Sequence, residues 1–263
     1  MLELIDSHAH LNDKVFDKVH FDAEFFEQDG YLLKRVLTVG YDKESILKTM
    51  EIVNNNERIY GIVGCHPQDA NEYDDKFEKL LITCSTHNKV VAVGEIGLDF
   101  YKEEHLKTRE QQTQVFIKQL ELAHKLKLPV VIHIRDAFPE ALEILKNRKH
   151  LLKNGGLVHC FTGTIDDYKS IKELGLIFSV GGPITFKNAG NIIDVVKNCD
   201  INDLLIETDC PYLTPEPFRG RVKNQPIMVR FVFKKVAEIR NMQNKELERI
   251  LLNNTNKLFK KLK

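Results

Sequence analysis

Eight short runs rich in valine, isoleucine and leucine recur along this 263-residue chain, and they limit its fold more than any other feature of the sequence. The runs lie at 3–7, 35–40, 59–64, 90–94, 129–134, 156–160, 177–181 and 203–208. Several are apolar along nearly their whole length, which is typical of parallel strands covered on both faces. We therefore predict eight strands of a parallel sheet.

The stretches between these runs have the pattern of amphipathic helices. Between the fourth and fifth runs, Phe116, Leu120 and Ala123 lie on one stripe of a helix. Further helices are predicted at 45–53, 139–148, 166–174, 187–198, 227–241 and 244–262. Eight strands alternating with helices, in units of roughly 20–40 residues, predict an α/β fold, the TIM (β/α)₈ barrel, and a doubly wound open sheet is the alternative. No linker, low-complexity tract or repeat interrupts the pattern, so we place residues 1–263 in a single domain.

The composition is that of a globular protein without a general attraction to nucleic acid. Hydrophobic residues make up 43% and charged residues 29% of the chain, which allows a large buried core. Lysine plus arginine equals aspartate plus glutamate, 38 of each, so the formal net charge is zero. A protein that coats nucleic acid would be basic. Any contact with nucleic acid must therefore be a local site.

The cysteines and the first residues predict an intracellular protein. The five cysteines are odd in number and lack CxxC spacing, which fits a reducing compartment better than a disulfide framework. No apolar run approaches the length of a membrane span. Glu3 and Asp6 interrupt the apolar core that a signal peptide would need. We expect a cytoplasmic protein, or a nuclear one if the source is eukaryotic, with no membrane contact.

Histidines gather near the ends of the predicted strands. Five of the ten histidines lie at or just after the carboxyl end of a run, at positions 8, 10, 66, 133 and 159. In a TIM barrel this face carries the active site. The other five are expected to be exposed or structural, at positions 20, 87, 105, 124 and 150.

The first run continues into Asp6-Ser7-His8-Ala9-His10. Because strand side chains alternate, Asp6, His8 and His10 are expected to face the same way. Two neutral imidazoles about 7 Å apart along an extended chain can hold one metal ion. The alternative is a polar loop whose histidines have no function, and the other strand ends decide between the two.

Four later strand ends supply further metal-binding side chains. They are Glu95 in GEIGLD, His133 in VVIHIRDA, His159 in GLVHCFTG and Asp209 in LLIETDCPYLTP. A lone strand histidine is more often a hydrogen-bonded core residue, but ligand types at so many strand ends favour a metal site. We assign one ion to His8, His10 and Asp209 and the other to His133 and His159, with the Glu95 carboxylate shared.

The expected chemistry follows from this pair of ions. Two divalent ions roughly 3.5–4 Å apart suit an in-line displacement at phosphorus. Mixed imidazole and carboxylate ligands do not choose sharply among Zn, Mn, Fe, Co and Mg. We expect two ions, Mg²⁺ or Mn²⁺ first and Zn²⁺ as a further option. Glu95 and Asp209 are the expected catalytic residues, and Asp209 would accept a proton from the attacking water.

Seven motifs, taken in order, resemble those of the TatD family of metal-dependent hydrolases. They are HAHLN, GCHP, GEIGLDFY, PVVIHIRDA, HCFTG, ETDCPYLTP and RGRVKNQP, and they run from residue 8 to about residue 226. The resemblance implies a TIM barrel and a divalent-metal-dependent deoxyribonuclease with 3′–5′ exonuclease activity. It carries the family's metal ligands onto the same six residues. The chain departs from the common pattern in the segment KVFDKVHFDAEFF and in NQP, where NEP is usual.

Further side chains are expected to support the site. His66 in GCHP, Arg135 and Arg219 could bind phosphate oxygens, the arginines in bidentate fashion. A surface salt bridge is the alternative for either arginine. Strand alternation turns Glu207 inward, where it could hold a ligand histidine or a third ion, and turns Thr208 outward.

The leading functional hypothesis is hydrolysis of DNA phosphodiester bonds in single strands or frayed ends. A dinuclear site could also hydrolyse an amide or ester, as amidohydrolases do, or deacylate a D-aminoacyl-tRNA. Amidohydrolases often bridge their metals with a carboxylated lysine on the fourth strand, where this chain has Glu95, and this difference favours the nuclease. The non-enzyme hypothesis is a degenerate barrel that is retained only as a binding scaffold. All six ligand types are intact, and this argues against it. Cys160 and Cys210 are expected to face away, so cysteine catalysis is not expected.

Overall fold

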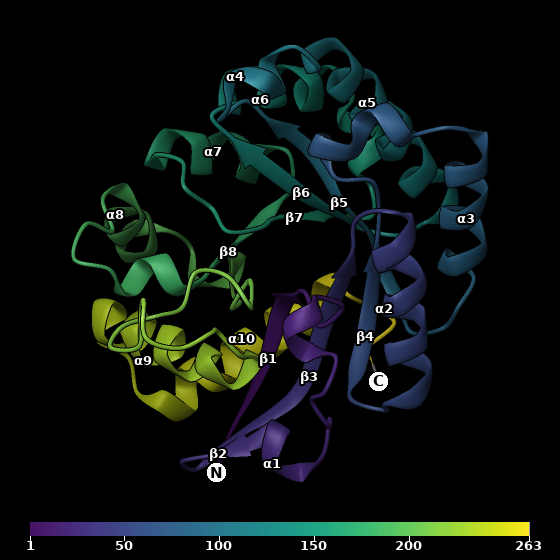
Figure 1. Ribbon diagram of the computed structural model, residues 1–263. Coiled ribbons are helices and arrows are strands. Elements are labelled where there is room, and N and C mark those ends of the chain that lie inside the picture. Colours follow the sequence, from purple (N-terminus) through teal and green to yellow (C-terminus); the bar gives the residue numbers. More distant parts are fainter. Residues whose placement is uncertain (263) are drawn as a thin grey trace.

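The computed structural model describes residues 1–262, and among them eight parallel strands form a barrel that helices surround (Figure 1). These strands are β1 (Leu2–Ala9), β3 (Tyr31–Gly40), β4 (Ile59–Val63), β5 (Val90–Asp99), β6 (Val130–Arg135), β7 (Gly156–Val158), β8 (Ile177–Val180) and β9 (Leu204–Ile206). Each of the eight predicted runs corresponds to one of these strands. The predicted TIM barrel is therefore confirmed.

The order of the strands excludes a doubly wound sheet. Neighbours in the sheet follow one another along the chain from β1 and β3 to β9, and every neighbouring pair is parallel. A doubly wound sheet would reverse its order at a switch point. The short strand β2 (Glu27–Gln28) pairs antiparallel with β3 outside this series.

Helices occupy most intervals between the strands and cover the outside of the barrel (Figure 1). The predicted helices correspond to α2 (Lys43–Asn55), α5 (Arg109–Leu126), α6 (Phe138–Asn147), α7 (Ile165–Glu173), α8 (Asn191–Asn198), α9 (Val229–Arg240) and α10 (Asn244–Leu258). The sequence analysis missed α3 (Asp75–Ser85) and two short helices, α1 (Ala23–Phe26) and α4 (Glu103–Leu106). Within residues 1–262, no helix is both long and apolar enough to cross a membrane.

Apolar side chains are buried on both faces of the strands. In β3, Leu37 and Val39 belong to a cluster that also holds side chains of β4, β5, β6, β7 and β9. Side chains from so many strands meet in the interior of the barrel. Val36, one residue before Leu37, belongs instead to the larger cluster that the outer helices share. This burial on both faces explains why the strand runs are continuously apolar.

Residues 206–210 close the barrel against residues 6–10 of the first strand, and we call this contact the barrel seam. The backbone N–H of Asp209 donates to the carbonyl oxygen of His8 at 2.9 Å. The N–H of His10 donates to the carbonyl oxygen of Cys210 at 2.8 Å. These bonds place Asp209 beside the two histidines that are 199 or more residues earlier in the chain.

A buried carboxylate reinforces the seam. Asp6 is fully buried and accepts hydrogen bonds from the backbone N–H of Thr208, at 2.9 Å, and from its hydroxyl. Burial raises the pKa of Asp6 well above its usual range, although the bonds from Thr208 oppose that effect. Thr208 does not line the cavity, and its side chain is buried in the seam against Asp6.

We predict that Thr208→Val lowers the free energy of unfolding by about 1–3 kcal/mol, because it keeps the side-chain shape but removes a donor from a buried carboxylate. Urea denaturation followed by circular dichroism measures the change. Thr83→Val is the control, since Thr83 is exposed on α3 and its hydroxyl donates only to the Lys79 carbonyl of the same helix. If both variants had the same free energy of unfolding, the hydrogen bond from Thr208 to Asp6 would not stabilise the seam.

Candidate metal centre

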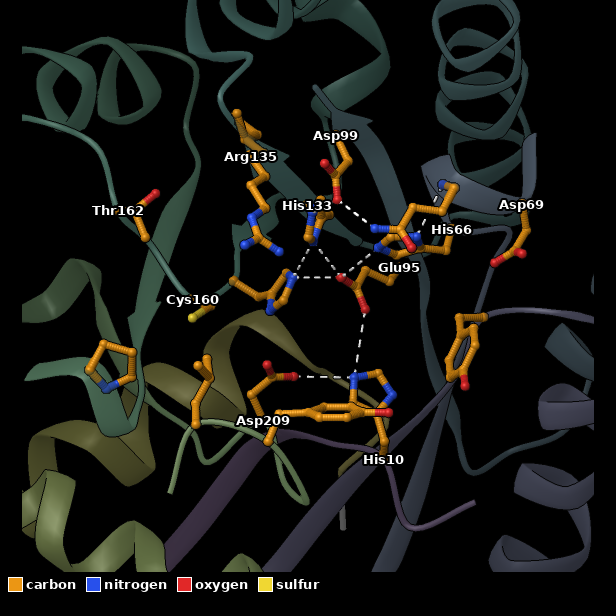
Figure 2. Close-up of a pocket in the computed structure, with 17 residues that line it drawn as sticks. His10, His66, Asp69, Glu95, Asp99, His133, Arg135, Cys160, Thr162 and Asp209 are labelled. Carbon is orange, nitrogen blue, oxygen red and sulfur yellow. Dashed lines mark hydrogen bonds and ion pairs between the residues drawn. The ribbon is translucent and has the colours of Figure 1, made fainter. Parts of the chain in front are cut away.

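A cavity of about 600 Å³ opens at the carboxyl ends of the barrel strands. Because all eight strands are parallel, the residues at their carboxyl ends converge on one rim. His10 follows β1, Glu95 lies within β5, His133 within β6, His159 follows β7 and Asp209 follows β9 (Figure 2). Each of these side chains lines the cavity.

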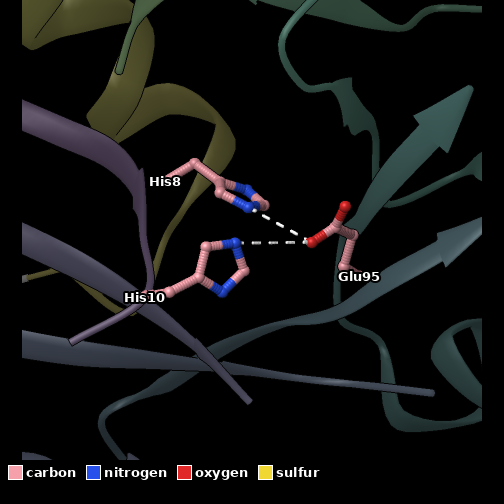
Figure 3. A group of neighbouring side chains, drawn as sticks. All are labelled: His8, His10 and Glu95. Atoms are coloured by element: carbon pink, nitrogen blue, oxygen red, sulfur yellow. Dashed lines mark ion pairs between the residues drawn. The ribbon is translucent and has the colours of Figure 1, made fainter. Parts of the chain in front are cut away.

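The Glu95 carboxylate lies between two groups of imidazoles. Its Oε2 is 3.3 Å from His8 Nε2 and 3.9 Å from His10 Nε2 (Figure 3). Its Oε1 is 2.7 Å from His133 Nδ1 and 2.7 Å from His159 Nε2 (Figure 2). Each carboxylate oxygen therefore faces a different pair of histidines.

Asp209 joins the first of these groups. Its Oδ1 lies 3.2 Å from His10 Nε2 and 3.7 Å from His8 Nε2. The seam holds its backbone against β1, so the position of this carboxylate depends on closure of the barrel. The structure thus brings together all six residues that the sequence analysis named as ligands. His8 also approaches His159 and Glu207 closely enough to share an ion, so the two predicted groups are in contact.

The donors and their burial fit a divalent cation. Both ring nitrogens of His8 are buried without a hydrogen-bond partner among residues 1–262, and so is Nδ1 of His10. Buried polar atoms are normally satisfied. His8, His10 and Glu95 approach closely enough to share one ion, and so do Glu95, His133 and His159. Imidazole and carboxylate donors suit several divalent metals.

The electrostatics of the cluster also favour positive charge. Burial acts to raise the pKa of the Glu95 carboxyl, but the imidazoles of His159, His66 and His133 outweigh it and hold that pKa well below its usual range. Burial acts to lower the pKa of His159, but the carboxylates of Glu95 and Glu207 outweigh it and raise that pKa well above its usual range. The buried carboxylates therefore stabilise positive charge on His159, whereas burial lowers the pKa of His8 and of His66.

Two buried carboxylates lie behind the histidines of the second group. Glu207 Oε1 lies 3.5 Å from His159 Nδ1, and the other Glu207 oxygen accepts a hydrogen bond from the Ser179 hydroxyl. Asp99 Oδ2 lies 3.4 Å from His133 Nε2. Carboxylates in this position orient ligand imidazoles and make them more basic. Glu207 points inward, where the sequence analysis expected it to hold a ligand histidine.

Asp99 was missed in the sequence analysis. The fourth predicted strand stopped at residue 94, but β5 continues to Asp99, so alternation places Glu95 and Asp99 on the same face. The signal was present in the motif GEIGLD. Asp99 also accepts a hydrogen bond from Gln68 at 2.7 Å and lies 3.1 Å from Nδ1 of His105, a buried histidine that the sequence analysis had grouped with exposed or structural ones.

The three predicted phosphate-binding residues lie at different distances from the cluster. His66 Nε2 is 3.5 Å from Glu95 Oε1, and His66 Nδ1 accepts a hydrogen bond from the Gln68 N–H. Arg135 lines the cavity, with its guanidinium carbon 3.8 Å from the centre of the Tyr101 ring. Arg219 stacks in the same way on Phe186, at 3.8 Å, and does not line the cavity.

The position of Cys160 corrects another expectation. Its side chain lines the cavity instead of facing away (Figure 2). The residue follows β7, which ends at Val158, and has a left-handed backbone with φ of 43°, so strand alternation does not apply to it. Burial and the nearby carboxylate of Glu207 raise the pKa of the Cys160 thiol well above its usual range. The thiol is therefore not activated as a nucleophile.

We predict that Glu207→Gln weakens Mn²⁺ binding by about 10- to 100-fold, because the carboxylate behind His159 loses its charge. Titration of metal-stripped protein with Mn²⁺, followed by electron paramagnetic resonance, measures the affinity. Glu246→Gln is the matched control, since Glu246 is exposed in the first turn of α10. An affinity within twofold of the unmodified protein would show that Glu207 does not support the ligand.

Comparison with known proteins extends over nearly the whole chain. Residues 5–260 match the family model described as TatD related DNase. An uncharacterized metal-dependent hydrolase of Bacillus subtilis, YabD, is 37% identical over 257 residues, which are 98% of this chain and 99% of YabD. The uncharacterized metal-dependent hydrolase YcfH of Escherichia coli is 33% identical over 259 residues, 97% of this chain and 95% of YcfH.

A solved structure shares both the fold and part of the sequence. The crystal structure of YJJV, a TatD homologue from Escherichia coli, superposes on this chain with a TM-score of 0.90. The two sequences are 30% identical, and the match covers 98% of each chain. The similarity therefore includes every strand that contributes to the metal centre.

Proposed function

Because the chain belongs to the TatD family of metal-dependent hydrolases, we propose that it is a deoxyribonuclease that uses two divalent ions to degrade single strands or frayed ends. The observation that carries the proposal is the Glu95 carboxylate, each oxygen of which faces a separate group of imidazoles. A shared carboxylate of this kind is suited to two neighbouring ions. Two-metal sites are common among nucleases and phosphatases.

From the residues present we assign a place to each proposed ion. His8, His10 and Asp209 would hold the first, His133 and His159 the second, and Glu95 would be common to both. Mg²⁺ or Mn²⁺ would serve, with Zn²⁺ as a further option. When bound, such ions would act as Lewis acids and would lower the pKa of a bound water, so that the water can lose a proton and attack phosphorus near neutral pH.

Asp209 is the proposed proton acceptor. Burial acts to raise the pKa of its carboxyl, but His10 and His8 outweigh it and lower that pKa, so the group is ionised at neutral pH. Both close contacts with these imidazoles use Oδ1. The side chain lines the cavity, so Oδ2 is available to accept the proton of an attacking water.

Two side chains that line the cavity are proposed to bind phosphate. His66 Nε2 can donate a hydrogen bond to a phosphate oxygen, because its Nδ1 already accepts one from the backbone. Arg135 can bind two phosphate oxygens with its planar guanidinium. Arg219, which lies outside the cavity lining, would contact only phosphates beyond the cavity.

The shape of the site favours ends over the interior of a duplex. The ligands are sunk at the end of the barrel, and Glu95 is 3% exposed. A single strand or a frayed end reaches such a site more easily than the middle of a base-paired duplex. With a formal net charge of zero, the protein is expected to contact only about two or three phosphates, which predicts a shallow dependence of affinity on salt.

The same metals could also serve amide or ester hydrolysis. Amidohydrolases often use a carboxylated lysine as the bridging group. No lysine is found among the cavity-lining residues of the described chain, and the Glu95 carboxylate lies between the two groups of imidazoles instead. This difference favours phosphodiester hydrolysis over amidohydrolase chemistry.

A substrate panel tests the proposal. Metal-stripped and Mn²⁺-reconstituted protein is given linear single-stranded DNA, linear duplex, closed circular duplex, RNA, a bis-aryl phosphate and a dipeptide. We expect two bound ions per chain after reconstitution, fastest loss of linear single strands from their ends, and no activity after chelation. Closed circular duplex as the preferred substrate, or undiminished activity without metal, would contradict the proposal.

We further predict that Asp209→Asn lowers kcat on single-stranded DNA by at least about 10²-fold, the usual effect of a lost general base. Metal content and melting temperature are measured on the same preparation, so that loss of metal or of folding is recognised. Asp194→Asn is the control, because Asp194 is exposed on α8. A normal kcat with both ions bound would show that Asp209 accepts no proton in the reaction.

A further inference from the structure

Tyr212 presents an aromatic ring at the mouth of the metal-containing cavity. It is three residues beyond Asp209, in the loop that follows β9, and its side chain lines the cavity. The residue is 48% exposed, unlike the largely buried ligands behind it. Its ring centre lies 5.9 Å from that of His10, with the two planes inclined at 63°.

The ring is held in place although it is exposed. The Tyr212 hydroxyl donates a hydrogen bond to Oδ2 of Asp13 at 3.1 Å. Its backbone N–H donates to the Asp209 carbonyl at 3.0 Å, and its carbonyl accepts from the Asn224 amide at 2.7 Å. Partial burial and the bond to Asp13 raise the pKa of the Tyr212 phenol, so the hydroxyl keeps the proton that it donates.

Asp13 is itself held by the local backbone. Its Oδ1 accepts a hydrogen bond from the Val15 N–H at 2.9 Å, which caps the short 3₁₀ helix Lys14–Phe16. The residue directly precedes the segment KVFDKVHFDAEFF, which departs from the common family pattern. The contact between Asp13 and Tyr212 therefore links the start of that segment to the wall of the cavity.

A second tyrosine of the cavity does not offer a comparable surface. Tyr41 packs edge-on against His10, with ring centres 5.4 Å apart, and against His66 at 6.4 Å. Its phenol pKa is raised chiefly by burial.

The residue next to Tyr212 extends the exposed surface of the cavity mouth. Leu213 is 38% exposed and also lines the cavity, so Tyr212 and Leu213 form a continuous apolar patch beside the charged ligands.

We propose that the ring of Tyr212, braced by Asp13, stacks on the nucleobase of the nucleotide whose phosphate enters the metal centre. This inference rests on the proposed function, because it requires a nucleic-acid substrate. A rigid aromatic face loses little conformational entropy on binding, and every nucleobase has a complementary π-face. A base inside a duplex has both faces covered by its neighbours, so the contact favours single strands and ends without selecting their sequence.

Direct binding tests the proposal without relying on turnover. The probes are a tetrathymidylate and a fully abasic tetramer of the same length and charge. Calorimetric titration of the Ca²⁺-loaded protein gives a Kd for each. We expect Tyr212→Ala to weaken tetrathymidylate binding by between about 5-fold and about 150-fold, the range measured for lost base stacking, and to leave binding of the abasic tetramer within twofold. Leu47→Ala, which truncates a 60% exposed side chain on α2, should change neither Kd.

The role of Asp13 is tested by a double-mutant cycle. Tyr212→Phe removes only the hydrogen bond, and Asp13→Ala removes it together with the cap of the 3₁₀ helix. Both leave the ring, so each should weaken tetrathymidylate binding by only about 2- to 10-fold. The double variant should bind no more weakly than the weaker single variant, because the two changes are coupled. Additive losses would show that Asp13 does not act through Tyr212.

The outcomes separate this inference from the proposed function. If the unmodified protein degrades DNA but Tyr212→Ala binds tetrathymidylate normally, or loses both probes equally, the stacking role is wrong and the nuclease stands. If the unmodified protein neither binds nor degrades DNA, the proposed function fails and the stacking role fails with it. Melting temperatures of all variants identify any that do not fold.

Discussion

A single buried carboxylate, that of Glu95, is the constraint on which the site depends. An ionised carboxyl in the interior of a barrel is costly unless its charge is compensated. Here the compensation comes from imidazoles on β1 and β6, from the imidazole that directly follows β7 and from one in the loop after β4, and each faces one of the two Glu95 oxygens. Only a barrel that brings these strand ends to a single rim can supply them, so the fold and the charge balance depend on each other.

The close approach of β5 and β6 is part of the same requirement. A Cβ on Gly97 would lie 2.0 Å from the carbonyl oxygen of His133, and one on Gly94 would lie 2.7 Å from the Cβ of Val131. Glycine at these two positions lets the strands approach, and Glu95 then reaches His133. Asp99 and Glu207 hold the same histidines from the other side. In His133 and in His159, one ring nitrogen faces Glu95, and the other faces Asp99 or Glu207, respectively. Such imidazoles keep one orientation before any ion arrives.

The strands and the convergence of the six ligand residues could be predicted because they depend on general properties of parallel barrels. Continuous apolar runs indicate strands that are buried on both faces. The carboxyl ends of parallel barrel strands converge on one rim, independently of the conformation of the loops. The expectation that Cys160 faces away failed because the backbone leaves the strand after Val158. Asp99 was missed for the opposite reason, because β5 continues beyond residue 94, where the predicted strand ended. The helix α3 had a signal in the spacing of Phe77, Leu81 and Cys84 behind the capping residue Asp74.

The seam between the first strand and the last has a consequence for synthesis on the ribosome. His10 and Asp209 are 199 residues apart, so at about 5–20 residues per second the carboxylate follows the imidazole by roughly 10–40 s. Until then β1 has a neighbour on only one side, and α10, which packs against it, has not yet been made (Figure 1). The nascent chain therefore carries an open β-edge, and the six candidate ligands come together only once Asp209 has been made. A barrel closed in this way cannot assemble its metal site while the ribosome is still making the strands that precede β9.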